Sequence, residues 1–138
     1  MVNKIKFCIV INVNAYRNKK LLNQVIKLLK KNHIVEIFES QSKDAAKKIF
    51  KNLSSKIFDR LVIAGGDGSF NFAVNEILKY PSLKDKKIGY IPTGTANILQ
   101  IEIRIQKNSE AIAEILTAEN TKKISLAKIN NQFFFLMT

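Results

Sequence analysis

Short apolar runs alternate along this chain with segments whose apolar residues recur at helical spacing. The runs cover residues 6–12, 34–38, 61–64 and 88–91, and they are rich in β-branched residues. Runs of this length and composition are typical of buried strands. The intervening segments place leucine, isoleucine and valine on one face and lysine on the other, as amphipathic helices do. Strand and helix in alternation predict an α/β fold with a parallel sheet and helices on both faces.

Capping residues and the last segments refine this picture. Ser42 is the expected N-cap of the second helix, and Ser109 is the expected N-cap of a later one. Residues 98–105 fit a short helix, although their alternation fits a strand as well. Residues 122–129 alternate, an Asn-Asn turn signal follows, and residues 133–137 form a second apolar run. This pattern predicts a β-hairpin at the end of the chain.

The composition narrows the classes of function. The 138 residues favour one main domain, and the net charge of +12 favours anionic partners. The lysines are scattered in pairs rather than clustered, so we expect a solvated basic surface and no nucleic-acid partner. Cys8 and His33 are the sole residues of their types, which excludes an internal disulfide and a histidine-based triad. With no long apolar segment, we expect a cytoplasmic protein, and the charge is compatible with a place at the inner membrane surface.

A glycine-rich loop follows the third apolar run, with the sequence Gly65-Gly66-Asp67-Gly68-Ser69. A helical pattern begins at Phe70, so the loop joins a strand to a helix. Glycines let a phosphate approach backbone N–H groups, and a helix N-terminus adds unpaired N–H groups. The Asp67 carboxylate would repel a phosphate unless a divalent cation bridges them or the carboxylate bonds a ribose or a loop amide. The alternative is a tight turn in which Asp67 caps the helix.

Two loops together carry a family resemblance. Residues 65–69 resemble the Gly-Gly-Asp-Gly-Thr/Ser loop shared by diacylglycerol kinases, sphingosine kinases and NAD kinases. Residues 92–97, Pro-Thr-Gly-Thr-Ala-Asn, resemble the Pro-x-Gly-Thr-Ala/Gly-Asn loop of the diacylglycerol kinase catalytic domain. The resemblance implies a Rossmann-like nucleotide domain and an ATP-dependent lipid kinase that uses Mg²⁺. Such an enzyme transfers the γ-phosphoryl group of ATP to a lipid hydroxyl, such as that of diacylglycerol, at a membrane surface.

The resemblance also implies which residues contact the nucleotide. From the two loops these are Gly65, Gly66, Asp67, Gly68, Ser69, Phe70, Asn71, Gly94 and Thr95. Asp67 is the implied Mg²⁺ contact, through Mg-ATP. A hydroxyl residue after the second strand adds Ser40, with Glu39 as the other alignment, and the turn after the first strand adds Asn12. That turn lacks the family's proline and glycine, so an Asx-type turn is the alternative role for Asn12. Phe72 stands where the family often has glutamate.

In the resembling family a hairpin like this one opens a second, β-rich domain that carries the lipid-facing surface and the general base. We therefore predict an α/β nucleotide-binding domain over residues 1–121 and the start of a second domain over residues 122–138. This chain is then the nucleotide-binding half of the kinase. The alternatives are an inactive nucleotide-binding fragment or an NAD kinase-like enzyme, and the 92–97 loop argues against the latter. Three consecutive phenylalanines, 133–135, predict self-association or a separate chain that covers the hairpin.

Overall fold

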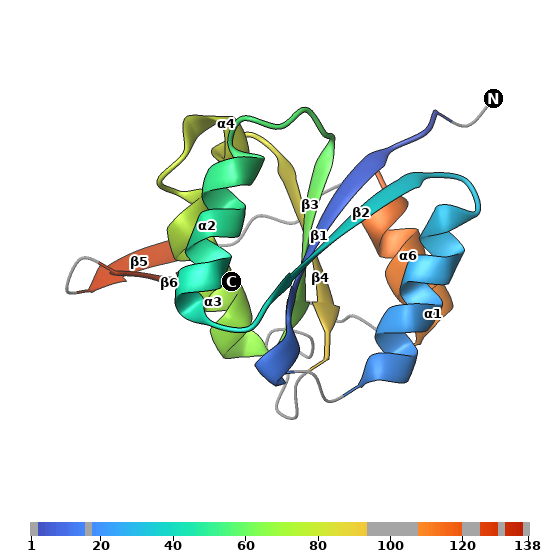
Figure 1. The fold of residues 1–138 in the computed structure, drawn as a ribbon, viewed down its shortest axis with the longest axis horizontal. Coiled ribbons are helices and arrows are strands. Elements are labelled where there is room, and N and C mark those ends of the chain that lie inside the picture. The colour runs from blue at the N-terminus through green and yellow to red at the C-terminus, as the bar shows by residue number, and fades with distance from the viewer. Residues whose placement is uncertain (1–2, 16–17, 94–107, 120–124, 130–131, 137–138) are drawn as a thin grey trace.

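The predicted strands form one parallel sheet. A computed structural model describes residues 3–15, 18–93, 108–119, 125–129 and 132–136 of the chain. Its four-stranded sheet has the order β2-β1-β3-β4, and every neighbouring pair is parallel (Figure 1). The strands are β1 (Lys6–Asn12), β2 (Ile34–Ser40), β3 (Arg60–Gly65) and β4 (Lys87–Pro92). The predicted α/β fold class is confirmed.

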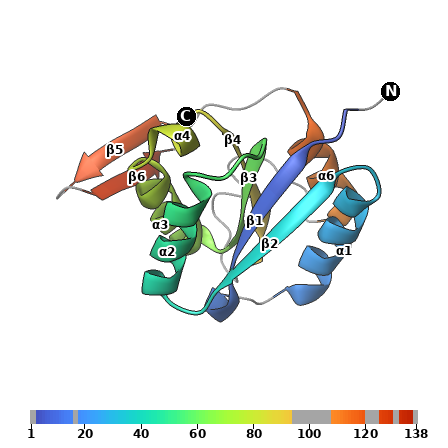
Figure 2. The same cartoon turned by 45° about the horizontal axis from the view of Figure 1, so that its top comes forward.

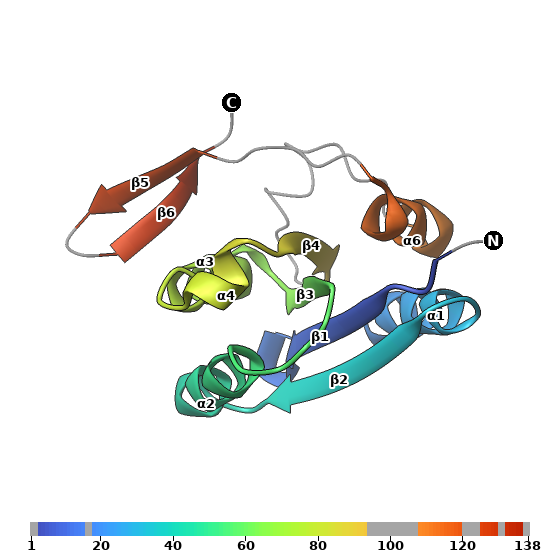
Figure 3. The ribbon, with the colours of Figure 1, turned by 90° about the horizontal axis from the view of Figure 1, so that it is seen from above.

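Helices cover both faces of this sheet, as predicted. On one face lie α1 (Lys19–Lys30) and α6 (Ser109–Thr117), which pack against each other (Figure 3). On the other face lie α2 (Lys43–Leu53), α3 (Asp67–Ile77) and the short α4 (Pro81–Lys84). The helices α1 and α2 each turn an apolar stripe toward the sheet and expose their polar face to water, so burial rather than propensity stabilises them.

The core is centred on β1. Residues 7–11 are all buried, because helices cover both faces of the strand. Cys8 is one of them and has no exposed surface. Burial, together with the nearby Glu36 carboxylate, raises the pKa of its thiol to about 11. The thiol therefore stays protonated at neutral pH and is a packing residue.

The N-cap residue predicted from the sequence is correct for one helix and wrong for another. Ser42 is the N-cap of α2, and its side chain accepts a hydrogen bond of 3.1 Å from the Ala45 N–H. The prediction of Ser109 as a cap is wrong, because Asn108 takes that position and accepts from the Ala111 N–H at 2.8 Å. Ser109 is instead the first helical residue and is buried. The helix predicted over residues 98–105 lies outside the described residues.

The strand order brings the strand ends together at one edge. From β1 the chain crosses to β2 on one side and then to β3 on the other side, as Figure 2 shows. The carboxyl ends of β1 and β3 therefore form a topological switch point, where open α/β sheets bind their ligands. Asn12 is in register with Ser40, and Gly65 is in register with Pro92. The loops singled out from the sequence thus begin along this edge.

A hairpin follows the α/β body. The strands β5 (Ser125–Ile129) and β6 (Gln132–Leu136) are antiparallel and form a sheet of their own. The predicted hairpin is therefore confirmed, and its strand β6 lies beside α3. The division into domains at residue 121 remains a prediction. Within the described ranges, none of the helices has the length and apolar character needed to cross a membrane.

Candidate functional site

The glycine loop turns directly from β3 into α3. Gly66 is the N-cap of α3, with extended backbone dihedrals (φ −94°, ψ −173°) and without a side-chain cap. The prediction that Asp67 could cap this helix is therefore wrong, because Asp67 is already the first helical residue. The Gly66 carbonyl accepts from the Phe70 N–H at 3.0 Å and starts the helical ladder. The N–H groups of the first turn have no partners within a helix, so they can meet an anion.

Two glycines of the loop are needed for different reasons. A Cβ on Gly65 would lie 2.7 Å from Ser69 Cβ and 2.8 Å from Ser69 Oγ, so the fold itself requires a glycine there. A Cβ on Gly68 would meet no atom within 4 Å, and Gly68 is exposed at the rim of a cleft. Packing in this chain therefore does not explain Gly68. A ligand that must approach the backbone of α3 closely would explain it.

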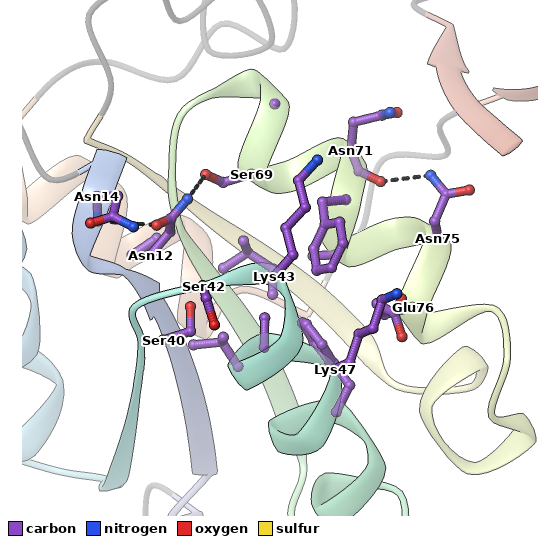
Figure 4. A pocket seen from close by; sticks show the side chains of 18 of the residues that line it. Asn12, Asn14, Ser40, Ser42, Lys43, Lys47, Ser69, Asn71, Asn75 and Glu76 are labelled. Atoms are coloured by element: carbon purple, nitrogen blue, oxygen red, sulfur yellow. Dashed lines mark hydrogen bonds between the residues drawn. The ribbon is translucent and has the colours of Figure 1, made fainter.

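Asn12 joins the end of β1 to the start of α3. Its Nδ2 donates to Ser69 Oγ at 2.8 Å, and its Oδ1 accepts from the Asn14 N–H at 3.1 Å (Figure 4). The second bond is the predicted Asx-type turn, followed by the 3-10 turn η1 (Val13–Ala15). Asn14 Nδ2 in turn donates to the Gln41 carbonyl at 2.6 Å. The ends of β1 and β2 and the first turn of α3 are thus fixed to one another.

The two candidates after the second strand differ in position. Ser40 is the last residue of β2, is buried, and donates from Oγ to the Ile11 carbonyl at 3.2 Å. It lines the same cleft as Asn12, whereas Glu39 is exposed and does not line it. The geometry therefore favours Ser40 over Glu39 as the residue at the end of β2 that lies near a ligand.

Asp67 has a partner that sequence reasoning missed. Tyr90 of β4 is 5% exposed, and its hydroxyl donates a hydrogen bond to the Asp67 carboxylate. Burial raises the pKa of Tyr90 strongly, and the charge and hydrogen bond of Asp67 raise it further. The Phe70 ring is buried and packs edge-on against Tyr90, with 5.2 Å between the ring centroids. The Phe70 side chain is therefore part of the core, and the Asp67 carboxylate has a fixed direction at the start of α3.

A cleft of about 870 Å³ lies between α2 and α3. Five of the predicted site residues line it: Asn12, Ser40, Gly68, Ser69 and Asn71. Gly65, Gly66, Asp67 and Phe70 lie next to it without lining it, and Gly94 and Thr95 fall outside the described residues. The Thr93 N–H donates to the Gly65 carbonyl at 3.0 Å, so the second loop starts beside the glycine loop.

The charged lining of this cleft was not predicted from the sequence. It consists of Lys43 and Lys47 from α2 together with Glu76 and Lys79 from the end of α3. The Glu76 carboxylate is only 3% exposed and forms an ion pair of 2.9 Å with Lys79 Nζ. Two lysine charges remain in excess, so the cleft favours an anionic ligand.

The donor set limits how a metal could be held. Among the described residues no group of three or more His, Cys, Asp or Glu side chains gathers at one place. The glycine loop offers one carboxylate, Asp67. Mg²⁺ in phosphoryl-transfer sites is typically bound by one or two carboxylates, substrate phosphates and water. Asp67 therefore fits a Mg²⁺ ion that arrives with a nucleotide and does not fit a metal site made of protein ligands alone.

The fold and the loop define a class of protein. A glycine loop and a cleft at the switch point of a parallel sheet are typical of α/β domains that bind phosphorylated ligands. The family model for the diacylglycerol kinase catalytic domain matches residues 6–129, and the chain belongs to that family. The resemblance found in the two loops is thereby confirmed.

Individual relatives agree with this assignment at modest identity. A diacylglycerol kinase of Staphylococcus carnosus is 27% identical over 117 residues, covering 84% of this chain and 38% of the relative. A Shewanella frigidimarina protein named "Probable lipid kinase YegS-like" is 28% identical over 128 residues, covering 91% of this chain and 41% of the relative. A crystal structure described as a diacylglycerol kinase of Bacillus anthracis matches the fold with a TM-score of 0.78 and 23% identity, covering 97% of this chain and 49% of that one.

Proposed function

We propose that this chain binds ATP with Mg²⁺ and serves as the nucleotide-binding part of a lipid kinase. The reaction would transfer the γ-phosphoryl group to the hydroxyl of diacylglycerol or a similar lipid at a membrane surface. The observation that carries the proposal is Gly68, which the fold does not require and which leaves open space at the N-terminus of α3. Named diacylglycerol kinases among the relatives support the choice of nucleotide and acceptor.

Phosphoryl transfer needs positioned phosphates and neutralised charge. In this proposal the phosphates approach the first turn of α3 through the space beside Gly68. Ser69 and Asn12, which bond each other, bound that space on the side of β1. Asp67, oriented by Tyr90, would hold the Mg²⁺ that neutralises phosphate charge when it is bound. We assign the general base to the β-rich second domain that the family resemblance implies.

A second candidate is nucleotide binding without phosphoryl transfer. The chain spans 38% of the length of the Staphylococcus carnosus relative. Nucleotide binding and phosphoryl transfer therefore need not both reside in this chain. Incubation with radiolabelled ATP, Mg²⁺ and diacylglycerol in mixed micelles separates the candidates. Labelled phosphatidate supports transfer, whereas nucleotide binding without labelled lipid supports a binding role.

The binding proposal is tested with two glycine variants. Gly68→Ala should keep or raise stability by up to about 1 kcal/mol, because alanine favours a helix over glycine. The same variant should lose most of the rise in melting temperature that Mg-ATP causes in the wild type, since the new methyl group occupies the phosphate space. Thermal melts with and without millimolar Mg-ATP measure both effects.

Gly65→Ala is the contrasting variant. It forces a methyl group against Ser69 and should destabilise the fold by about 1–3 kcal/mol. A wild-type melting temperature that does not respond to Mg-ATP would contradict nucleotide binding. A Gly68→Ala variant that responds as the wild type does would show that phosphate does not use this space.

A further inference from the structure

The charges of the cleft are distributed unevenly. At the end of α3, Glu76 and Lys79 neutralise each other. At the other end, where α3 begins, Lys43 extends from α2 toward the first turn of α3 (Figure 4). Among the described carboxylates none forms an ion pair with Lys43. Of the two lysine charges in excess, the Lys43 ammonium therefore lies at the glycine-loop end of the cleft.

An aromatic ring holds Lys43 in this place. Its Nζ atom lies 5.9 Å from the centroid of the Phe72 ring, which is within the range of a cation–π contact. Phe72 belongs to α3 and also lines the cleft. Such a contact attracts the ammonium group without neutralising its charge, so the group remains able to bind an anion. Phe72 stands where a family resemblance predicts a carboxylate, which would have neutralised this lysine.

Lys43 occupies a position that disfavours a cation. It is the first residue of α2, at the positive end of the helix dipole, where acidic residues such as its neighbour Asp44 are favoured. Residues that break such a local rule are often placed there by function. The fold therefore gains little from Lys43 at this position, and an anion between α2 and α3 would account for it.

We propose that Lys43, held over the Phe72 ring, binds the polyphosphate of the nucleotide opposite the N-terminus of α3. This inference rests on the proposed function and adds a phosphate-binding residue that lies outside both the 65–69 loop and the 92–97 loop. Backbone N–H groups of α3 would contact the phosphates from one side of the cleft and the Lys43 ammonium from the other. The glycine loop offers a metal ion only one carboxylate, Asp67. The Lys43 ammonium would add to the positive charge that neutralises the phosphates.

The test compares lysine variants on one helix. Lys43→Gln removes the charge, and Lys43→Arg keeps it. Lys48→Gln is the matched control, because Lys48 is an exposed residue of the same helix that does not line the cleft. Calorimetry measures the Kd of ATP, ADP and AMP, and melts without ligand measure stability.

We expect Lys43→Gln to weaken ATP binding about tenfold or more, as loss of a charge-assisted hydrogen bond does. The loss should be smaller for AMP, and Lys43→Arg should restore most of the affinity. Phe72→Leu should weaken ATP binding less than Lys43→Gln, because it releases the ammonium group without removing it. Without ligand, Lys43→Gln should keep its melting temperature within about 4 °C of the wild type. The reason is that a cation is unfavourable at a helix N-terminus, so its removal should not destabilise α2.

The outcomes separate this inference from the proposed function. A wild-type chain that binds none of the three nucleotides overturns both. Wild-type binding with equal losses in Lys43→Gln and Lys48→Gln overturns this inference alone, because the effect would then be one of net charge. Equal losses for AMP and ATP also overturn it, since the lysine would not be contacting the polyphosphate.

Discussion

At the scale of single residues, Asp67 and Tyr90 define one interaction at the start of α3. The sequence left Asp67 with several roles, and the structure gives its carboxylate the hydroxyl of a buried tyrosine. An ionised carboxylate has about four lone-pair sites, so one hydrogen bond leaves capacity for a metal ion. The Tyr90 bond therefore does not by itself exclude a metal ion at Asp67, and replacing Tyr90 should affect the carboxylate rather than the core.

Tyr90→Phe tests this interaction through its pH dependence. The raised pKa of Tyr90 means that its stabilising contribution is complete below the unfolded pKa of about 10 and is lost as pH rises toward the folded value. At pH 7 the variant should be less stable than the wild type by about 1 kcal/mol. The difference should shrink above pH 10, because only the wild type then loses the Tyr90 contribution. Urea unfolding at pH 7 to 11 measures it, and a constant difference would argue against the Tyr90–Asp67 bond.

At the scale of elements, Arg60 connects β3 to the end of α6. Its Nη1 donates to the Leu116 carbonyl at 2.6 Å and to the Ala118 carbonyl at 2.8 Å. These carbonyls belong to the last turn of α6, where backbone acceptors lack helical partners and a cation suits the helix dipole. A residue at the start of a central strand thus caps a helix more than fifty positions away.

Arg60→Met should destabilise the fold by about 1–3 kcal/mol, because the two partly buried backbone carbonyls lose a charged donor. Arg60→Lys should lose less, since an ammonium keeps the charge but not the fork of donors. Hydrogen exchange should show the last turn of α6 opening first in the methionine variant. Unchanged exchange in α6, together with a normal urea midpoint, would mean that water replaces Arg60 without cost.

Elements were predictable to the extent that their signals are local. The apolar runs 61–64 and 88–91 match β3 and β4 to within one residue at each end, because short apolar runs mark the strands of a sheet covered by helices. The last helix was expected in the right place but with the wrong cap. Asn108 and Ser109 are equally good caps by propensity, and the apolar face of the helix does not distinguish a shift of one residue.

The site was predictable where topology alone brings residues together. Asn12, Ser40 and residues 68–71 meet because parallel strands end at one edge of the sheet. Lys43 and Glu76 were missed because their place depends on how α2 and α3 are rotated about their axes, which local patterns do not specify. The one available signal was the lysine in the first turn of α2, where a cation is disfavoured.

At the scale of the whole molecule, the described residues form two sheets that differ strongly in how much of the fold packs against them. The strand β1 is covered on both faces, whereas β5 and β6 form a two-stranded sheet beside α3. Two-stranded sheets are at best marginally stable alone in water. We therefore expect native-state hydrogen exchange to separate them. Amides of β1 should exchange only through global unfolding, and those of β5 and β6 through a local opening with a lower free energy and a weaker dependence on urea.

This contrast also decides whether the hairpin depends on a partner. If the hairpin opens alone, the opened form exposes three consecutive phenylalanines, 133–135, and the protein should self-associate as its concentration rises. Sedimentation over a hundredfold range of concentration, paired with the exchange experiment, tests both steps. A monomer throughout, with β5 and β6 as protected as β1 and equally sensitive to urea, would mean that α3 alone gives the hairpin a stable place. The predicted dependence on a covering chain would then be wrong, and the hairpin would belong to the cooperative unit that carries the cleft.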